Sequence, residues 1–201
     1  MNPITTTNTL VFASSNANKI AEIKSLLPSN FQLLSSHDLG INEEIPETAD
    51  TLEGNALMKA QYLFDKTSKS CFADDTGLEV MALNGRPGVF SARYAGPERS
   101  AQMNIEKLLH ELDGVLDRRA QFRTAIAFVT EKGDAHVFEG KVEGLISTKW
   151  LGNAGFGYDP VFLPEGLSQS FAEMTLADKN ARSHRARAFE AFIRFLETQK
   201  N

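Results

Sequence analysis

The sequence has a single cysteine, Cys71, among its 201 residues, so an intramolecular disulfide and a cysteine-rich zinc site are both excluded. A chain without disulfides suits a reducing compartment, and we expect it to be cytoplasmic. No apolar run approaches the roughly 18 residues that span a bilayer. No lysine or arginine precedes the short apolar run that begins at Leu10, so the basic start of a secretory signal is lacking. We therefore expect no membrane partner.

Positive charge is also scarce. Lys and Arg number 21 against 26 Asp and Glu, which gives a formal net charge of −5 and a pI near 5.4. Broad nucleic-acid binding usually needs a basic face, so we expect no nucleic-acid partner. An anionic ligand would require the positive charge to be gathered locally. The composition, 42% hydrophobic, is otherwise that of a globular protein of one or two lobes sharing a continuous core.

Apolar residues recur at helical spacing in four segments, which predicts helices at about 18–27, 51–64, 100–112 and 182–198. A buried strand is expected at residues 10–13, and a hairpin around the turn EKGDA. Strands and helices alternate early, whereas hairpins dominate the middle. This order predicts the α/β class, with a mixed central sheet flanked by helices. No repeat or linker divides the chain, so we expect a single domain over residues 1–201, with residues 1 to about 8 disordered.

Two adjacent aspartates, Asp74 and Asp75, follow apolar residues in the segment FADDTGLEV. Neighbouring strand residues point to opposite faces, so one carboxylate can face a cleft while the other supports the backbone. We expect the strand to end here, with Thr76 and Gly77 forming a turn. A carboxylate at a strand end suits Mg²⁺, which takes a few carboxylates together with waters and substrate phosphates. Two aspartates that merely form a turn are the alternative at this point.

A strand–loop–helix junction lies earlier, in the segment ASSNANK. Ser14, Ser15 and Asn16 offer hydroxyl and amide groups just before a helix, and Lys19 lies in its first turn. The unpaired N–H groups of a helix start favour phosphate. A lysine opposes the helix dipole there unless an anion binds between them. Simple capping of the helix by Ser or Asn explains the same residues, and the spacing of a Walker loop is absent.

Acidic residues, Glu47 among them, precede the second predicted helix, where they complement its dipole. Asn55 and Lys59 lie four residues apart on one face of that helix, so both can reach the same ligand. Solvated surface charge is the alternative for each of these residues taken alone.

A glycine-rich loop, GNAGFGYDPVF, carries Phe156, an aromatic residue that can stack on a base. The alternative is a hairpin whose aromatic residues simply reach the core. Beyond the loop, the segment ADKNARSHRARAF gathers four basic residues near the start of the last helix: Lys179, Arg182, Arg185 and Arg187. They form the local positive patch that an anionic ligand requires, and a solvated helix face is the alternative.

Five motifs stand in a fixed order along the chain: SSNANK, ETADTLEGNALMKA, FADDTGLEV with GRPGVFSARYAG, GFGYDP, and DKNARSHR. On these motifs the chain resembles the inosine triphosphate pyrophosphatases, which act on noncanonical purine nucleoside triphosphates, from about residue 10 to residue 196. The resemblance implies an elongated α/β fold of two lobes around a central sheet, with the active-site cleft between the lobes. It further implies a Mg²⁺-dependent homodimer that hydrolyses ITP, dITP and XTP to the monophosphate and pyrophosphate, which removes deaminated purines from the nucleotide pool.

The resemblance also implies roles for the matching residues. Glu47 and Asp75 would hold Mg²⁺, with Asp75 as the catalytic proton acceptor and Asp74 in a secondary role. The nucleotide would be bound by the other matching residues: Ser14, Ser15, Asn16, Lys19, Lys59, Thr76, Phe156, Gly157, Tyr158, Asp159, Lys179, His184 and Arg185. Of these, Phe156 would stack on the purine, and the last three would lie near its 6-oxo group.

Two other functions stay open. One is a pyrophosphatase of the same fold class that acts on noncanonical pyrimidine triphosphates, which the GFGYDP motif with its downstream SHR disfavours. The other is a non-catalytic module that senses purine nucleotides. The acids and lysines placed for metal-assisted hydrolysis argue against the sensor, because binding alone does not need them.

Overall fold

The computed structural model describes residues 8–43 and 45–199. In these residues a seven-stranded sheet has the order β2-β1-β3-β5-β6-β7, with β4 paired to β3. The chain divides into two compact units. Unit 1 comprises the described residues up to Asp75 together with 125–138, and unit 2 comprises 76–124 and the described residues from 139 onward. The expected disorder of residues 1 to about 8 concerns residues outside the described ranges, except Asn8, which begins β1.

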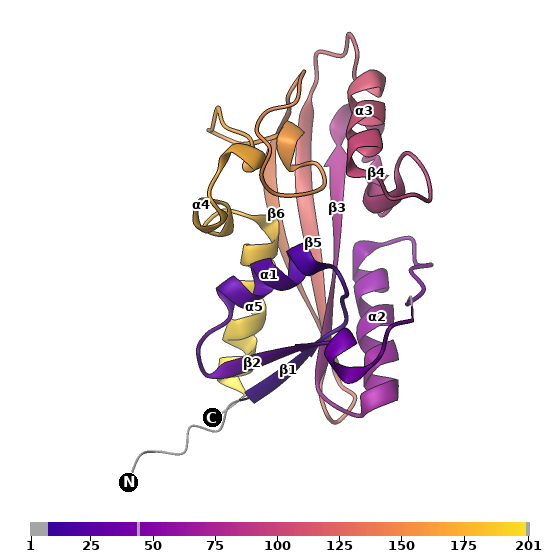
Figure 1. Ribbon diagram of the computed structural model, residues 1–201, viewed down its shortest axis with the longest axis vertical. Coiled ribbons are helices and arrows are strands. Elements are labelled where there is room, and N and C mark those ends of the chain that lie inside the picture. Colours follow the sequence, from indigo (N-terminus) through magenta and orange to yellow (C-terminus); the bar gives the residue numbers. More distant parts are fainter. Residues whose placement is uncertain (1–7, 44, 200–201) are drawn as a thin grey trace. The chain divides into compact units, whose positions relative to one another are not determined.

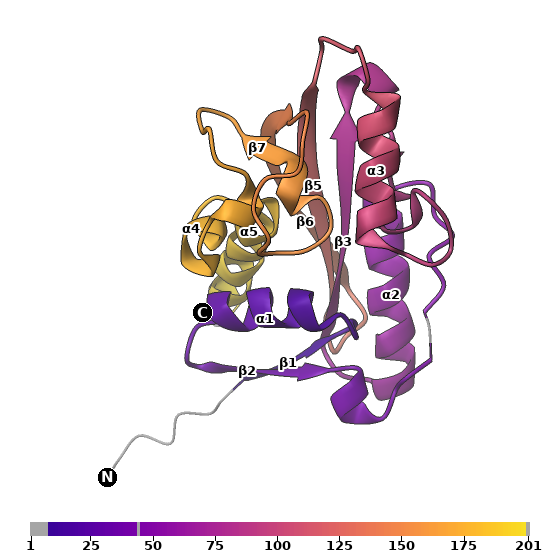
Figure 2. The same ribbon diagram turned by 45° about the horizontal axis from the view of Figure 1, so that its top comes forward.

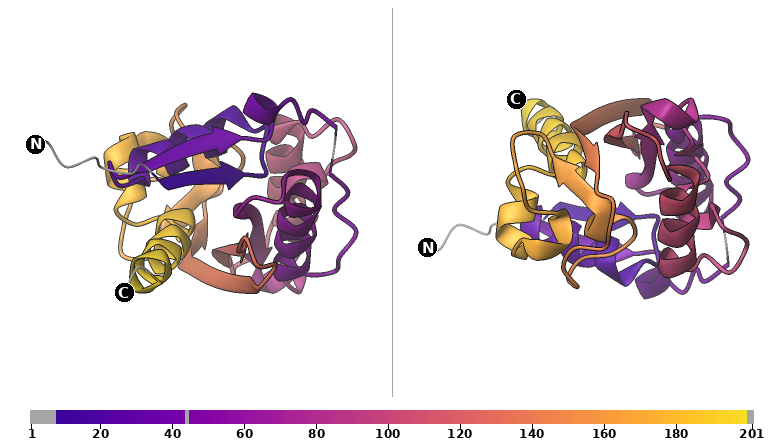
Figure 3. Two further views of the ribbon diagram at one scale, coloured as in Figure 1. Left: turned by 90° about the horizontal axis from the view of Figure 1, so that it is seen from below. Right: turned by 90° about the horizontal axis from the view of Figure 1, so that it is seen from above.

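Unit 1 begins with two parallel strands joined by a helix. Its elements are β1 (Asn8–Phe12), α1 (Ala17–Leu26), β2 (Phe31–Ser35), η1 (His37–Leu39), α2 (Leu52–Thr67) and the first half of β3 (Cys71–Val80). β1 pairs in parallel with both β2 and β3. Parallel pairing requires a crossover between the strands, and α1 and α2 supply the two crossovers. Figures 1 and 2 show α1 running alongside the β1–β2 pair, and Figure 3 shows that pair side by side from below.

The core of unit 1 forms where β1 and β3 meet. Phe12 and Phe72 are register partners, and their rings stack with centroids 4.7 Å apart. The apolar stripe predicted for α2 packs inward, and its members Leu52, Ala56, Ala60 and Leu63 are all buried. The helix therefore forms as its sequence indicates, because folding buries one apolar face made of leucine and alanine side chains.

Unit 2 holds most of the remaining elements. They are η2 (Met81–Leu83), β4 (Pro87–Gly88), η3 (Ser91–Arg93), α3 (Ala101–Glu111), part of β5 (Arg119–Val129), part of β6 (Ala135–Ile146), η4 (Asp159–Val161), β7 (Phe162–Pro164), η5 (Phe171–Glu173), α4 (Leu176–Asn180) and α5 (His184–Thr198). The short β4 pairs antiparallel with β3, and β7 pairs antiparallel with β6.

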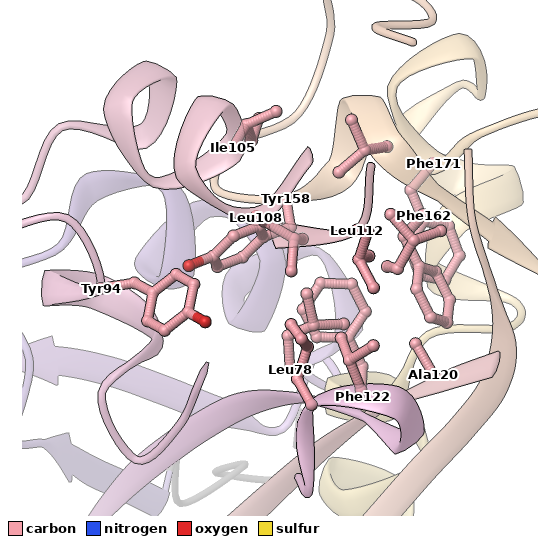
Figure 4. Packing of buried hydrophobic residues seen from close by; sticks show 14 of the residues in the cluster. Leu78, Tyr94, Ile105, Leu108, Leu112, Ala120, Phe122, Tyr158, Phe162 and Phe171 are labelled. Atoms are coloured by element: carbon pink, nitrogen blue, oxygen red, sulfur yellow. The ribbon is translucent and has the colours of Figure 1, made fainter. Parts of the chain in front are cut away.

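The core of unit 2 mixes aliphatic and aromatic side chains, as Figure 4 shows. Ile105 and Leu108 of α3 are fully buried, as the spacing predicts. They belong to one cluster with Phe122 of β5 and with Phe162 and Phe171, whose ring centroids lie 5.3 Å apart. Each buried large apolar side chain contributes about 1.5–3 kcal/mol to stability.

The α/β class and the mixed sheet flanked by helices are confirmed, with two differences in detail. The last helix begins at His184 rather than 182, because the Ser183 hydroxyl accepts a hydrogen bond from the amide of Ala186 and caps the helix there. Residues 176–180 form a separate short helix, α4. Among the described residues, no helix has the length and hydropathy to cross a membrane.

The expected turn at Thr76 and Gly77 is wrong. β3 runs without interruption from Cys71 to Val80, so both aspartates lie inside a strand instead of at its end. The strand tolerates them because each carboxylate meets a basic side chain, as described below. The single domain and the cleft between lobes stay predictions.

Two leucine-to-alanine variants test whether the unit 2 core carries stability. Leu108 is fully buried, whereas Leu116 is 99% exposed. We expect Leu108→Ala to lower the free energy of unfolding by about 2–5 kcal/mol, because a cavity replaces the side chain. Leu116→Ala is the matched control and should change it by less than about 0.5 kcal/mol. Urea unfolding followed by circular dichroism measures both, and equal effects would contradict the described core.

Candidate functional site

The loop after β1 in unit 1 is organised by its own side chains. Asn16 caps α1, since its Oδ1 accepts hydrogen bonds from the amides of Asn18 at 3.0 Å and Lys19 at 3.2 Å. The Ser14 hydroxyl accepts from the amide of Asn16 at 3.2 Å, and Ser15 is exposed. The Asn16 side chain thus caps the helix, as in the capping alternative.

The cation in the first turn of α1 has an anion beside it. The Lys19 ammonium lies 2.9 Å from Oδ1 of Asp74, whose side chain is only 1% exposed. No acidic residue occupies the first turn of α1 itself, and Asp74 pairs with the lysine of that turn. The predicted binding of a phosphate between the helix start and Lys19 stays a prediction.

Asp75 is held from α2 by two side chains. Asn55 Nδ2 donates a hydrogen bond to Asp75 Oδ2 at 3.2 Å, and the Lys59 ammonium lies 3.6 Å from Oδ1. The same ammonium donates to Oε1 of Glu47 at 2.6 Å. Asn55 and Lys59 sit one helical turn apart, so the predicted shared face of α2 is confirmed. We call Lys19, Glu47, Lys59, Asp74 and Asp75 the charged cluster.

Burial sets the electrostatics of the charged cluster. It raises the pKa of Asp75 above its ordinary value of 3.8, although Lys59 and Lys19 oppose the rise. Burial lowers the pKa of Lys59, but the surrounding carboxylates, Asp75 foremost, outweigh it and raise that pKa above 10.5. Lys59 therefore remains a cation at neutral pH, and three carboxylates face two lysines.

The donors of the charged cluster suit a hard divalent cation. Glu47 and Asp75 both contact the Lys59 ammonium, which shows that their oxygens can approach a common cation. In the part of the chain that the structure describes, no three Asp, Glu, His or Cys side chains form a complete metal site. Mg²⁺ commonly binds through one or two carboxylates and takes waters and phosphate oxygens for the rest. The residues present fit such a partly open site.

A second group of predicted site residues gathers in unit 2 around a buried aspartate. Asp159 Oδ2 accepts hydrogen bonds from the amide of Phe156 at 2.8 Å and from the Lys179 ammonium at 2.5 Å. Gly155 has a φ of +74°, and a Cβ there would collide with the Asp159 carboxylate. Glycine is therefore required for the loop to fold over Asp159.

Phe156 lies among cations. The Lys179 ammonium is 4.7 Å from the centre of its ring, and the Arg185 guanidinium carbon is 5.6 Å from it. Arg185 is 1% exposed and donates from Nη2 to Thr76 Oγ1 at 3.1 Å. The Thr76 and Thr124 hydroxyls are 2.7 Å apart. We call Thr76, Phe156, Asp159, Lys179 and Arg185 the aromatic–basic cluster.

Two residues predicted to contact the nucleotide, Tyr158 and His184, are buried in unit 2. The Tyr158 hydroxyl donates to the carbonyl of Ser91 at 2.9 Å, and burial raises its pKa. The ring of His184 stacks on Phe122 with centroids 4.5 Å apart. Gly157 has a φ of +60° in the same loop as Tyr158. Of the basic patch, Lys179 and Arg185 are buried, whereas Arg182 and Arg187 are exposed as in the solvated-face alternative.

Three residues that contact the predicted site residues were not assigned this role from the sequence. Thr124 and Phe122 are ordinary residues of an alternating strand, and no local motif marks them. Asn55 shares a helix face with Lys59, and it contacts the Ala49 amide and the Asp75 carboxylate.

Comparison with known proteins places the chain among close relatives. The sequence profile of the Ham1 family matches residues 10–195. The dITP/XTP pyrophosphatase of Flavobacterium psychrophilum is 52% identical over 188 residues, which cover 94% of this chain and 98% of that protein. The enzyme of the same name from Flavobacterium johnsoniae is 50% identical over 191 residues, or 95% and 99% of the two chains. The solved Ham1 protein of Staphylococcus aureus aligns with a TM-score of 0.87 at 39% identity, over 96% of this chain and 100% of that one.

The raised pKa of Asp75 predicts a stability effect with a defined sign. The folded protein holds the Asp75 proton more tightly than the unfolded chain, so ionising Asp75 costs stability as the pH rises above 3.8. We expect Asp75→Asn to be more stable than wild type at pH 7, with the difference vanishing as the pH falls below 3.8. Urea unfolding across this range measures it.

Asp117 provides a control of opposite sign. The hydrogen-bonded Arg119 lowers the pKa of Asp117 to about 2, so the charge of Asp117 is favourable to the fold above pH 3.8. If Asp117→Asn changes the free energy of unfolding at pH 7, it should therefore lower it. A destabilised Asp75→Asn at pH 7 would contradict the described electrostatics.

Proposed function

Because the chain belongs to the Ham1 family, we propose that it hydrolyses the deaminated purine nucleoside triphosphates ITP, dITP and XTP to the nucleoside monophosphate and pyrophosphate. Relatives that share about half of its residues over nearly its full length carry the name dITP/XTP pyrophosphatase. The observation that carries the proposal is the bridge from Lys59 to Glu47 and Asp75, which gathers a cation and two carboxylates in one place.

We propose Mg²⁺ as the cofactor, with Glu47 and Asp75 as its protein ligands and phosphate oxygens and waters completing its shell. Bound there, the ion would neutralise negative charge that builds on the leaving pyrophosphate. The oxygen-only donor set supports this choice over a softer metal, which would favour sulfur or imidazole ligands.

The side chains of the charged cluster have distinct roles in this proposal. A water attacks the α-phosphorus while the bond from that phosphorus to the bridging oxygen breaks, and pyrophosphate leaves. Asp75 orients the water and accepts its proton as a general base. Lys19 and Lys59 provide fixed positive charge along the triphosphate, and positioned charge carries most of the catalysis in phosphoryl transfer.

The aromatic–basic cluster supports recognition of the base. Phe156 would stack on the purine, and Lys179 and Arg185 would donate hydrogen bonds to the 6-oxo group. Adenine presents a 6-amino group, which would leave such a buried donor unpaired at a cost of about 1–3 kcal/mol. The deaminated bases hypoxanthine and xanthine carry the 6-oxo group, so hydrogen-bond polarity favours them over adenine.

The resemblance further supports a homodimer that works in the cytoplasm. Size-exclusion chromatography with light scattering measures the mass in solution. A single species of one chain, 22.2 kDa, would contradict the dimer.

A panel of triphosphates tests the reaction. We expect ITP, dITP and XTP to give monophosphate and pyrophosphate in the presence of Mg²⁺, and ATP to be a poor substrate. Chelation of the metal by EDTA should abolish turnover, and so should Asp75→Asn. Ion chromatography of the products separates pyrophosphate from orthophosphate. Preferential cleavage of pyrimidine triphosphates, release of orthophosphate, or binding without turnover would each overturn the proposal.

Phe156→Ala tests the base contact. Loss of stacking is worth about 1–3 kcal/mol, so the KM for dITP should rise roughly 5- to 150-fold while kcat changes little. Phe90→Ala is a matched control, because Phe90 is 55% exposed and also has a guanidinium over its ring, that of Arg93 at 5.3 Å. Steady-state kinetics measure both variants, and equal KM values for Phe156→Ala and wild type would exclude the stacking role.

A further inference from the structure

Asn55 joins the two acidic parts of the charged cluster. It is 1% exposed, and both ends of its amide are used. Its Oδ1 accepts a hydrogen bond from the amide of Ala49 at 2.9 Å, and its Nδ2 donates to Asp75 Oδ2 at 3.2 Å. Ala49 lies two residues after Glu47. One rigid amide thus ties the segment that carries Glu47 to the carboxylate of Asp75.

The segment around Glu47 is pressed against the start of α2. Thr51 caps this helix by accepting a hydrogen bond from the amide of Gly54 at 3.0 Å. A Cβ on Gly54 would meet the Cβ of Ala49 at 2.7 Å, so the close approach requires glycine there. One turn further along, Lys59 binds Glu47 itself. α2 therefore contacts the segment at two places, Gly54 and Lys59.

The two bridges differ in what they can fix. Lys59 is a point charge on a flexible stem, so it attracts Glu47 and Asp75 without fixing the orientation of either. Asn55 has two side-chain torsions, both ends bonded, and no charge. Its Nδ2 contacts Oδ2 of Asp75, whereas Lys59 is nearer to Oδ1. Asn55 thus constrains the orientation of the carboxylate, whereas Lys59 attracts it.

We propose that Asn55 is a positioning residue that sets the spacing and orientation of Glu47 and Asp75 and thereby their affinity for a divalent cation. The inference rests on the proposed function, in which these two carboxylates hold the metal. Partners that orient metal ligands typically account for about 10- to 100-fold in metal affinity or activity. Asn55 acts through the two acids and needs no contact with substrate.

The test measures metal binding and turnover separately. Mn²⁺ is titrated into nucleotide-free protein and its free concentration is followed by electron paramagnetic resonance. We expect Asn55→Ala to raise the dissociation constant for Mn²⁺ about tenfold or more. The Mg²⁺ concentration that half-saturates dITP hydrolysis should rise in parallel, while kcat at saturating Mg²⁺ falls far less. Asn55→Leu, which fills the buried volume without an amide, is the second variant if Asn55→Ala folds poorly.

Asn104→Ala is the matched control. Asn104 is 4% exposed on α3 and bridges in the same way, with Oδ1 accepting from the amide of Ala95 at 2.7 Å and Nδ2 donating to the carbonyl of Ala92 at 3.1 Å. Its loss should lower the melting temperature without changing Mn²⁺ affinity. Unchanged affinity in both Asn55 variants, or an equal loss in Asn104→Ala, would overturn the inference. Absence of dITP turnover by wild type would overturn the proposed function instead, because Mn²⁺ binding is measured without nucleotide.

Discussion

The contact of Lys59 with Glu47 and Asp75 is the interaction on which the candidate site depends. Adjacent carboxylates inside a strand repel each other, and burial disfavours their charged forms. Lys59 on one side and Lys19 on the other supply the opposing charge, so β3 can continue through Asp74 and Asp75 without breaking. The same balance keeps Lys59 protonated and leaves Asp75 with a raised pKa.

The two units carry different chemistry and share one strand. The charged cluster belongs to unit 1, and the aromatic–basic cluster belongs to unit 2. The division falls at the peptide bond between Asp75 and Thr76, so neighbouring residues of β3 serve the two clusters. In the proposed function, the charged cluster would bind the metal and the phosphates, and the aromatic–basic cluster would bind the base.

Sequence reasoning found most of the elements because burial periodicity is local. The apolar stripes on α2, α3 and α5 follow from spacing alone, and the order of strands and helices predicts the class. Helix ends and the course of β3 depend on partners distant in the sequence. The turn expected at Thr76 failed because Lys19 and Lys59, which make the charged strand tolerable, reach it from two separate helices.

The membership in a family was predicted from five motifs and is confirmed, whereas the roles of individual residues remain predictions. Several of the residues that the resemblance predicts to contact the nucleotide also make contacts within the protein. Asn16 caps a helix, Tyr158 bonds to Ser91, and Asp159 anchors its own loop. The contact of Asn55 with Ala49 and the contact of Thr124 with Thr76 could not be predicted from the sequence, because they depend on tertiary packing.

The buried guanidinium of Arg185 has a consequence for the cell. An arginine side chain is protonated throughout the physiological pH range, and it has no lone pair to offer. The polarity of the hydrogen bonds that it makes is therefore permanent. In the proposed function, a preference for a 6-oxo over a 6-amino group that rests on arginine would not change with pH near neutrality, whereas one that rests on histidine would.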